Sequence, residues 1–376
     1  MTISTTRPNY GAMQLAIFRG EDPGGVLWQP RLDWWYKVNK ANGTIPEHLK
    51  DASFPEICDY CHASIRYFMW DRSWLRGNSW LKFRYNTVDV ELDWKDDQTL
   101  RRTWHTPIGD LSQVIEFDEW KVSSHITEYR LKEAEDFKIL KYIHEDEEWF
   151  WDEELFQQDL AKYGDYGTPQ FYFRRSPIQR LMIEEMGLQQ AIYFMYDHPT
   201  VLEEYVEFAT AADDVMYDVI CKSPVQIVNL GENVDGFIDS PKVWKKHLVP
   251  YYAMRTDQLH AAGKFVSVHI DGTMKSLLPH LRDFDYDAIE APTAAPQGDV
   301  TIEQIRDAVG DLIVMDGIPS LLVNENQYPV EEMVAYTKKM IDYFYPRLVL
   351  GVSDEVPPGA DIERIRMIGE LVKELV

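Results

Sequence analysis

The chain contains the stretch Phe265-Val266-Ser267-Val268-His269-Ile270-Asp271-Gly272, an apolar, β-branched run that carries a histidine and an aspartate to its carboxyl end. A second run, Leu348-Val349-Leu350-Gly351-Val352-Ser353-Asp354-Glu355, ends in two adjacent acids. Buried strands rarely carry such groups, whereas the carboxyl ends of parallel strands often hold binding or catalytic side chains. The two runs therefore predict two strands of one parallel sheet whose ends share a site.

The composition limits the classes of protein to which the chain can belong. Its 376 residues are 45% hydrophobic, enough for one large α/β barrel or two ordinary domains. The net charge of −25 argues against a nucleic-acid or anionic-membrane surface, because such surfaces need Lys and Arg beside phosphate. No apolar run has the length of a signal peptide or a membrane span. We expect a soluble, cytoplasmic protein without nucleic-acid or membrane partners.

Short apolar runs alternate with longer amphipathic stretches from about Gln170 onward. This alternation is typical of βα units on a parallel sheet. Helices are expected at about Met13–Arg19, Pro177–Tyr196 and Pro199–Cys221. The most economical fold is a (β/α)8 TIM barrel, whose strands are buried on both faces. Seven of its strands are expected at Gly25–Trp28, Pro169–Phe173, Gln226–Leu230, Phe265–Ile270, Asp287–Glu290, Leu312–Met315 and Leu348–Gly351.

An N-terminal β-rich excursion interrupts this rhythm between about residues 79 and 152. Residues 81–92 alternate like an antiparallel strand, and residues 103–119 resemble a hairpin around Pro107-Ile108-Gly109-Asp110. We interpret the excursion as lying beside the barrel, where it could serve as a lid. The expected organisation is a single barrel domain over residues 1–376 that carries this insertion.

The sequence Cys58-Asp59-Tyr60-Cys61-His62 has the spacing of a c-type haem attachment motif. Covalent haem attachment requires export of the chain, and no segment of the sequence predicts export. A redox-active cysteine pair would be expected in thioredoxin-like surroundings, which the neighbouring sequence lacks. The surrounding residues 54–69 have the apolar spacing of an amphipathic helix. We expect buried structural cysteines.

Acids stand at the ends of five successive expected strands, in the sequences Gly231-Glu232-Asn233, His269-Ile270-Asp271, Glu290-Ala291, Asp316-Gly317 and Ser353-Asp354-Glu355. Alternate side chains of a strand share a face, so His269 and Asp271 could form two ligands of a metal ion. Clustered carboxylates need either a metal or a proton, so acid/base catalysis stays open as an alternative. Glu290 and Asp316 could also cap helices or hold a histidine N–H.

Aromatic residues lie at the ends of the expected strands Gly25–Trp28 and Pro169–Phe173. Trp28 ends the first strand and is followed by Arg31, Trp34 and Trp35, while Tyr172 and Arg174 lie at the end of the second. Such clusters are often core or interface, but they also suit a ring-shaped substrate whose anionic group pairs with an arginine. We therefore list these six residues as candidate substrate-binding residues.

The order of these motifs resembles the uroporphyrinogen decarboxylase superfamily. The resemblance rests on Gly231-Glu232-Asn233, on Ser240-Pro241-Lys242-Val243-Trp244 and on residues 262–272, with the terminal Leu350-Gly351 and Val356-Pro357-Pro358 resembling the last barrel unit. It covers residues 165–376 well and the first strand weakly. It implies a (β/α)8 barrel, in agreement with the fold predicted from the alternation of strands and helices.

Departures from the superfamily pattern favour one branch of it. The arginine-rich segment and late Gly-His-Gly of true uroporphyrinogen decarboxylases are missing here, since the chain has only Arg31 among tryptophans and Gly351-Val352-Ser353. The chain looks closer to the cobalamin-dependent methyltransferases, which hold zinc through a His-x-Cys pair and a late cysteine. His269 matches that pair, and Asp271 replaces its cysteine. Oxygen ligands make a metal harder, which favours an oxygen substrate.

The resemblance implies a methyltransferase of the O-demethylase type. It would move a methyl group from a small, aromatic O-methyl donor to a Co(I) corrinoid on a partner protein, with zinc or another divalent metal activating the ether oxygen. His269, Asp271 and one acid from Glu232 or Asp354 would be the metal ligands, and the remaining acid would support a ligand or donate a proton to the leaving oxygen. The alternative is a metal-free decarboxylase or lyase acting on a small carboxylate. The sequence leaves open the donor, the metal and whether the chain forms a homodimer.

Overall fold

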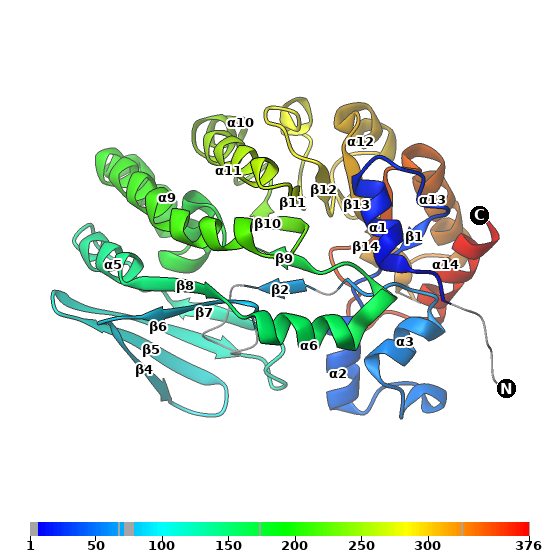
Figure 1. Cartoon of the computed structure of the whole chain (residues 1–376), viewed down its shortest axis with the longest axis horizontal. Helices are drawn as coiled ribbons and strands as arrows, with labels where there is room; N and C mark the ends of the chain where they lie inside the picture. Colours follow the sequence, from blue (N-terminus) through cyan, green and yellow to red (C-terminus); the bar gives the residue numbers. More distant parts are fainter. Residues whose placement is uncertain (1–6, 67, 71–78, 173, 325, 376) are drawn as a thin grey trace.

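The computed structural model describes residues 7–66, 68–70, 79–172, 174–324 and 326–375. Its main feature is a curled, fully parallel sheet (Figure 1). The strands of this sheet are β1 Leu27–Trp28, β2 Phe68–Trp70, β9 Gln170–Tyr172, β10 Ile227–Val234, β11 Phe265–Ile270, β12 Ala288–Glu290, β13 Ile313–Pro319 and β14 Leu348–Ser353. They are hydrogen-bonded in the order β1-β14-β13-β12-β11-β10-β9-β2.

These strands form because their sequences are apolar on both faces. Every residue of β13 and β14 is buried, and in β11 only Phe265 is partly exposed. Both faces can be buried because helices cover the outer side, where Figure 1 shows α9 to α14 in an arc around the sheet. The register pairs His269 with Glu290, and Gly317 with Gly351, so the carboxyl ends of neighbouring strands lie level.

The helices follow the expected βα alternation. Their bounds are α1 Tyr10–Phe18, α2 Asp33–Asn42, α3 Phe54–Tyr60, α5 Asp136–Glu145, α6 Glu153–Tyr163, α7 Pro177–Arg180, α8 Leu188–Asp197, α9 Pro199–Lys222, α10 Pro241–Val243, α11 Val249–Ala261, α12 Ile302–Val309, α13 Val330–Phe344 and α14 Ile362–Glu374. Two π-helical turns, η3 Leu181–Glu185 and η4 Trp244–Leu248, follow α7 and α10. Shorter turns are η1 Glu47–Leu49, η2 Gly164–Tyr166, η5 Leu278–His280 and η6 Ser320–Val323.

The prediction of an α/β fold with a parallel sheet is confirmed, while a closed barrel is only partly formed. The backbone N–H of Ser64 donates to the carbonyl of Trp28 at 2.8 Å, which joins the segment before β2 to the end of β1. In the described part of the chain, however, no strand ladder connects β1 with β2. The sheet is therefore curled towards closure, with β1 and β2 as its edges.

Two helices predicted from the sequence are shorter than expected. The helix expected over residues 54–69 ends at Tyr60, and the strand β2 follows at Phe68–Trp70. The helix expected over residues 177–196 is broken before Leu188, because Gly187 adopts a left-handed φ of 82° that favours glycine. Phe173, at the end of a predicted strand, lies outside the described residues.

The segment between the β2 and β9 strands forms two antiparallel sheets. One joins β3 Leu81–Tyr85 to β8 Glu147–Trp151, and the other has the order β4-β5-β6-β7, with bounds Asp89–Trp94, Thr99–Thr106, Gly109–Phe117 and Ser124–Glu128. The turn at residues 86–88 divides the single strand expected over residues 81–92 into two. Figure 1 shows these sheets as a separate layer beside the parallel strands.

Cys58 and Cys61 are both buried free thiols, as a structural role requires. Burial raises the pKa of Cys58 well above its ordinary value, which keeps the thiol protonated and unreactive. Within the residues that the structure describes, none of the helices is long and apolar enough to cross a bilayer.

Candidate functional site

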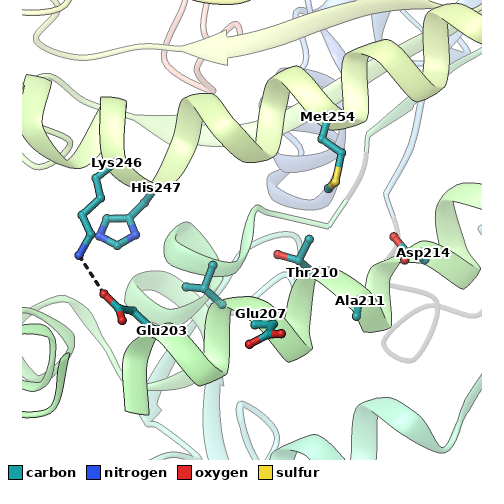
Figure 2. Close-up of a pocket in the computed structure, with 9 residues that line it drawn as sticks. Glu203, Glu207, Thr210, Ala211, Asp214, Lys246, His247 and Met254 are labelled. Atoms are coloured by element: carbon teal, nitrogen blue, oxygen red, sulfur yellow. Dashed lines mark hydrogen bonds and ion pairs between the residues drawn. The ribbon is translucent and has the colours of Figure 1, made fainter. Parts of the chain in front are cut away.

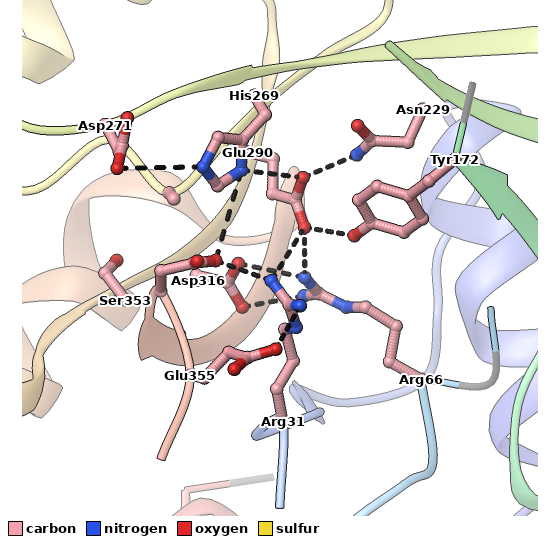
Figure 3. Close-up of polar contacts among 12 residues, drawn as sticks. Arg31, Arg66, Tyr172, Asn229, His269, Asp271, Glu290, Asp316, Ser353 and Glu355 are labelled. Carbon is pink, nitrogen blue, oxygen red and sulfur yellow. Dashed lines mark hydrogen bonds and ion pairs between the residues drawn. The ribbon is translucent and has the colours of Figure 1, made fainter. Parts of the chain in front are cut away.

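A cluster of charged and polar side chains lies at the carboxyl ends of the parallel strands (Figure 3). Its members come from β9 to β14 and from the segments that follow β1 and precede β2. They are Arg31, Arg66, Tyr172, Asn229, His269, Asp271, Glu290, Asp316, Asp354 and Glu355. Most of these side chains are buried, whereas those of Asp271 and Asp354 are 32% and 41% exposed. The cluster therefore has an inner, dry part and an outer part that solvent reaches.

Glu290 is the centre of the inner part. One of its oxygens accepts hydrogen bonds from Arg66 at 2.6 Å and from the hydroxyl of Tyr172. The other oxygen accepts from Asn229 at 2.6 Å and lies 3.1 Å from Nδ1 of His269. Burial alone would raise the pKa of Glu290, but the bond from His269 and the nearby arginine charges outweigh it and hold the pKa well below its usual range. Glu290 is therefore an anion that accepts from four side chains.

This carboxylate fixes the orientation of His269. Because an ionised carboxylate only accepts hydrogen bonds, Nδ1 of His269 carries the proton shared with Glu290. Nε2 then faces the outer part, 3.8 Å from Oδ2 of Asp271. Burial disfavours a charge on the imidazole, but Asp354, Asp271 and Glu290 together raise the pKa of His269 well above its ordinary value. The structure thus presents an imidazolium N–H at the edge of the site.

The two buried arginines of the cluster are paired with carboxylates of the protein. Arg66 forms two bonds to Asp316, at 2.9 and 2.7 Å, and Gln29 orients its Nε. Arg31 donates to Asp354 at 2.5 Å and also to Glu355. Burial raises the pKa of Asp316 to about 7, although Arg66 opposes that shift. Figure 3 shows the two guanidinium groups side by side, with acids around them.

Five of the residues selected from the sequence meet in this cluster. They are Arg31, Tyr172, His269, Asp271 and Asp354. Trp28 and Trp35 are instead buried core residues, and Trp34 is half-buried on α2. Arg174 pairs with Glu147 of β8 at 3.1 Å, so it joins the antiparallel layer rather than the cluster.

The β10 strand bulges beside β11, and Glu232 lies in this bulge. Leu230 pairs with Val268 and Val234 pairs with Ile270, so three residues of β10 stand opposite His269 alone. Glu232 accepts a bond from the backbone N–H of Ser176 at 2.6 Å. Burial raises the pKa of Glu232 to about 7. Glu232 is thus a buried acid held by Ser176, and its role as a ligand or catalytic acid stays a prediction.

The residues predicted to hold a metal do not fit one ion in this arrangement. Asp271 approaches Nε2 of His269, whereas Asp354 lies 4.0 Å from Nδ1, on the other edge of the ring. A single ion bound to one ring nitrogen would therefore miss one of the two carboxylates. Throughout the described ranges, no three His, Cys, Asp or Glu side chains converge as metal ligands do.

Two members of the cluster were not foreseen from the sequence. Arg66 stands in a run that has helical spacing, so its charge was assigned no place in the site. Asn229 lies inside a strand, and its one signal is a polar residue between apolar neighbours. Glu290 and Asp316 were noted as strand-end acids, and Glu290 does hold the N–H of His269.

Gly351 of β14 is required by this packing. A Cβ at residue 351 would lie 2.2 Å from Oδ1 of Asp316 and 3.0 Å from the carbonyl oxygen of Gln29. Asp316 cannot retreat because Arg66 holds both of its oxygens. We expect Gly351→Ala to lower the free energy of unfolding by about 1–3 kcal/mol, as overpacked cores do.

Chemical denaturation measures this loss, and Gly359→Ala is the matched control, since nothing lies within 4 Å of the added Cβ there. Equal stability of the two variants would contradict the tight packing inferred around Asp316.

A groove of about 450 Å³ lies elsewhere, between α9 and the helical stretch formed by η4 and α11 (Figure 2). Its walls carry Glu203, Glu207 and Asp214 on one side and Lys246 and His247 on the other. Lys246 and Glu203 form an ion pair across it at 3.4 Å. The groove shares no residue with the strand-end cluster.

Comparisons with known proteins agree with this fold. Residues 178–375 match the family model described as uroporphyrinogen decarboxylase (URO-D). No curated protein matches the chain. Among solved structures, a methyltransferase from Methanosarcina mazei is similar with a TM-score of 0.61 and 10% identity, over 96% of this chain and 98% of that one. A B12-independent methionine synthase from Shewanella sp. W3-18-1 has a TM-score of 0.41 and 12% identity, over 88% and 91% of the two chains.

Proposed function

The chain belongs to the uroporphyrinogen decarboxylase family, and from this premise we propose that it is a methyltransferase that moves a methyl group from a small, neutral methyl ether to a Co(I) corrinoid carried by a partner protein. The fold that it shares with a methyltransferase from Methanosarcina mazei is compatible with this reaction, and at 10% identity that likeness concerns the fold alone. The proposal depends on the cluster at the strand ends.

The observation that carries the proposal is the position of His269. Glu290 holds Nδ1, and Nε2 faces the part of the cluster that solvent reaches, beside Asp271. When a methyl ether loses its methyl group, negative charge develops on the oxygen, and a nearby acid stabilises that charge by giving it a proton. An imidazolium N–H in this place suits a departing alkoxide or phenolate.

The arginine pairs support a neutral donor. Arg66 is engaged by Asp316 and Glu290, and Arg31 by Asp354 and Glu355. A substrate carboxylate would have to displace one of these partners to reach a guanidinium group. A neutral ether requires no such exchange, so the pairing favours methyl transfer over the decarboxylase alternative.

In the proposed reaction the carbon–oxygen bond of the donor breaks and a carbon–cobalt bond forms. The new bond takes its electron pair from Co(I), while the pair of the broken bond stays on the oxygen. His269 Nε2–H gives a proton to that oxygen, so an alcohol or phenol leaves. Asp271, which is partly exposed, is placed to return a proton to the imidazole, and Asp354 stabilises the imidazolium by its charge. No step is assigned to a metal ion.

The test is an anaerobic assay of the full chain with free cob(I)alamin and 2-methoxyphenol. We expect conversion of cob(I)alamin to methylcobalamin, followed by absorbance, and slower conversion with 2-methoxybenzoate, whose carboxylate competes with Asp354 and Glu355 for Arg31. Aliphatic methyl ethers and methylamines in the same assay define the donor class, and metal analysis of the sample tests the expectation of zinc.

The decarboxylase alternative gives the opposite result. Release of CO₂ from a small carboxylate, with no methylcobalamin from any donor in the panel, would replace the proposed function. In that case Arg31, whose acid partners are partly exposed, would be the residue to examine for substrate binding.

A further inference from the structure

The segments that follow β10 and β11 are joined through one carboxylate, that of Asp235. Its Oδ2 accepts the backbone N–H of Thr273 at 2.6 Å, and its Oδ1 accepts the hydroxyl of Thr273 at 2.9 Å. Oδ1 also accepts the backbone N–H of Phe237 at 2.8 Å. A backbone bond from Gly236 N–H to the carbonyl of Thr273, at 2.5 Å, lies beside these contacts. The two segments therefore form one hydrogen-bonded unit.

The close approach of Asp235 depends on a glycine. Gly272 has a φ of +63°, and a Cβ there would lie 2.3 Å from Oδ2 of Asp235. A side chain at residue 272 would thus both strain the backbone and occupy the position of the carboxylate. The glycine at residue 272 therefore leaves the space that the Asp235 carboxylate occupies.

Asp271 stands at the start of this pinned segment. On one side, its backbone N–H donates to the carbonyl of Val234 at 3.2 Å. On the other side, Thr273 is held by Asp235 two residues later. The Asp271 carboxylate lies 3.8 Å from Nε2 of His269, and among the described residues no shorter polar contact fixes it there. Its place beside His269 is therefore set mainly by the backbone on either side.

We infer that Asp235 is a positioning residue: by holding Thr273 it keeps Asp271 beside Nε2 of His269, where the departing oxygen receives its proton. This inference rests on the proposed function for its chemical consequence and on the observed contacts for its geometry. Asp235 itself touches no reacting group. Its effect passes through Asp271, and that route can be tested.

The first variant is Asp235→Asn, which keeps the shape of the side chain but has only one acceptor oxygen, so it cannot accept the N–H groups of both Thr273 and Phe237 as the carboxylate does. Misplacing a catalytic group by about 1 Å costs up to about 10²-fold in rate, so we expect kcat for 2-methoxyphenol to fall by about 10-fold with little change in KM. The Asp235→Ala variant loses every acceptor of this side chain, so its kcat should be lower still.

Asp299→Ala is the matched control for Asp235→Ala. Oδ1 of Asp299 accepts the backbone N–H groups of Met274 and Lys275, at 2.8 and 3.2 Å, so it caps the same segment at its other end. Loss of this cap leaves the Asp235–Thr273 bonds in place. We expect wild-type kcat for Asp299→Ala, and faster hydrogen exchange of the Thr273 amide in Asp235→Ala alone.

A double-mutant cycle separates positioning from a general structural role. If Asp235 acts through Asp271, Asp235→Asn should cause little further loss of kcat in the Asp271→Asn background, whereas independent effects would multiply. Multiplying losses, or wild-type kcat and exchange in Asp235→Ala, would overturn the inference. If the wild-type protein transferred no methyl group from any donor, the proposed function would fail. Hydrogen exchange of the Thr273 amide, together with a crystal structure of the Asp235→Asn variant, would still decide whether Asp235 holds Asp271 in place.

Discussion

Replacing His269 with glutamine lowers the rate of methyl transfer by about 10²- to 10⁴-fold, the usual contribution of a positioned general acid. Glutamine can still donate a hydrogen bond to Glu290, but it cannot give a proton to the departing oxygen. The expected loss is therefore in kcat, with the fold retained. Steady-state assay with cob(I)alamin and 2-methoxyphenol measures it. His280→Gln is the control, since His280 pairs with Asp283 outside the cluster.

The pH dependence of the wild-type rate tests the same role. Burial opposes the imidazolium, but Asp354, Asp271 and Glu290 raise the pKa of His269 well above 6.5. The acid form therefore persists through neutral pH, and kcat/KM should fall only as the pH rises through that raised pKa. The stability that the charged His269 contributes follows the same course: it is fully present below about pH 6.5 and is lost in this alkaline range. A rate that rises over this range, or an active His269→Gln variant, would contradict the assignment.

Replacing Arg66 with methionine destabilises the protein by about 3–5 kcal/mol, the usual cost of breaking a buried ion pair from one side. The Arg66 side chain is fully buried, as are those of Glu290 and Asp316, to which it donates. Without it, two carboxylates that burial disfavours would lose their main counter-charge. Arg66→Lys keeps the charge but cannot reproduce the bidentate bond to Asp316, so its loss should be intermediate.

Urea denaturation of the full chain measures this effect. The matched control is Arg84→Met, because Arg84 pairs with Glu148 at the surface, where both side chains are about half or more exposed. Exposed pairs add little to stability, so this variant should unfold as the wild type does. Equal free energies of unfolding for Arg66→Met and Arg84→Met would show that the buried network stabilises the protein no more than an exposed ion pair does.

Much of the parallel sheet could be predicted from the sequence, because its strands are short apolar runs followed by acids. The runs at residues 265–270 and 348–351 are strands, and His269, Asp271 and Asp354 lie together as their strand positions indicated. The β2 strand could not be predicted, since residues 54–69 have helical spacing throughout. The place of Arg66 in the cluster could not be predicted either, because Arg66 lies in the same run.

The predicted ligand set shows a second limit of sequence reasoning. Glu232 follows the expected strand Gln226–Leu230, but the β10 strand continues past it with a bulge, and its carboxylate accepts a bond from Ser176. A bulge depends on pairing between strands, and the spacing of residues along one strand does not show it. Likewise, the orientation of the His269 ring depends on Glu290, which is adjacent in the sheet and 21 residues away in sequence.

The charge balance of the cluster is divided between two distant parts of the chain. Its acids Glu290, Asp316, Asp354 and Glu355 all lie within the region that matches the family model, whereas their cationic partners Arg31 and Arg66 lie before it. A fragment cut to residues 165–376 would thus keep all five acids of the cluster and lose both guanidinium groups. Such a fragment would bury carboxylates without their counter-charges, so it should unfold more readily than the full chain.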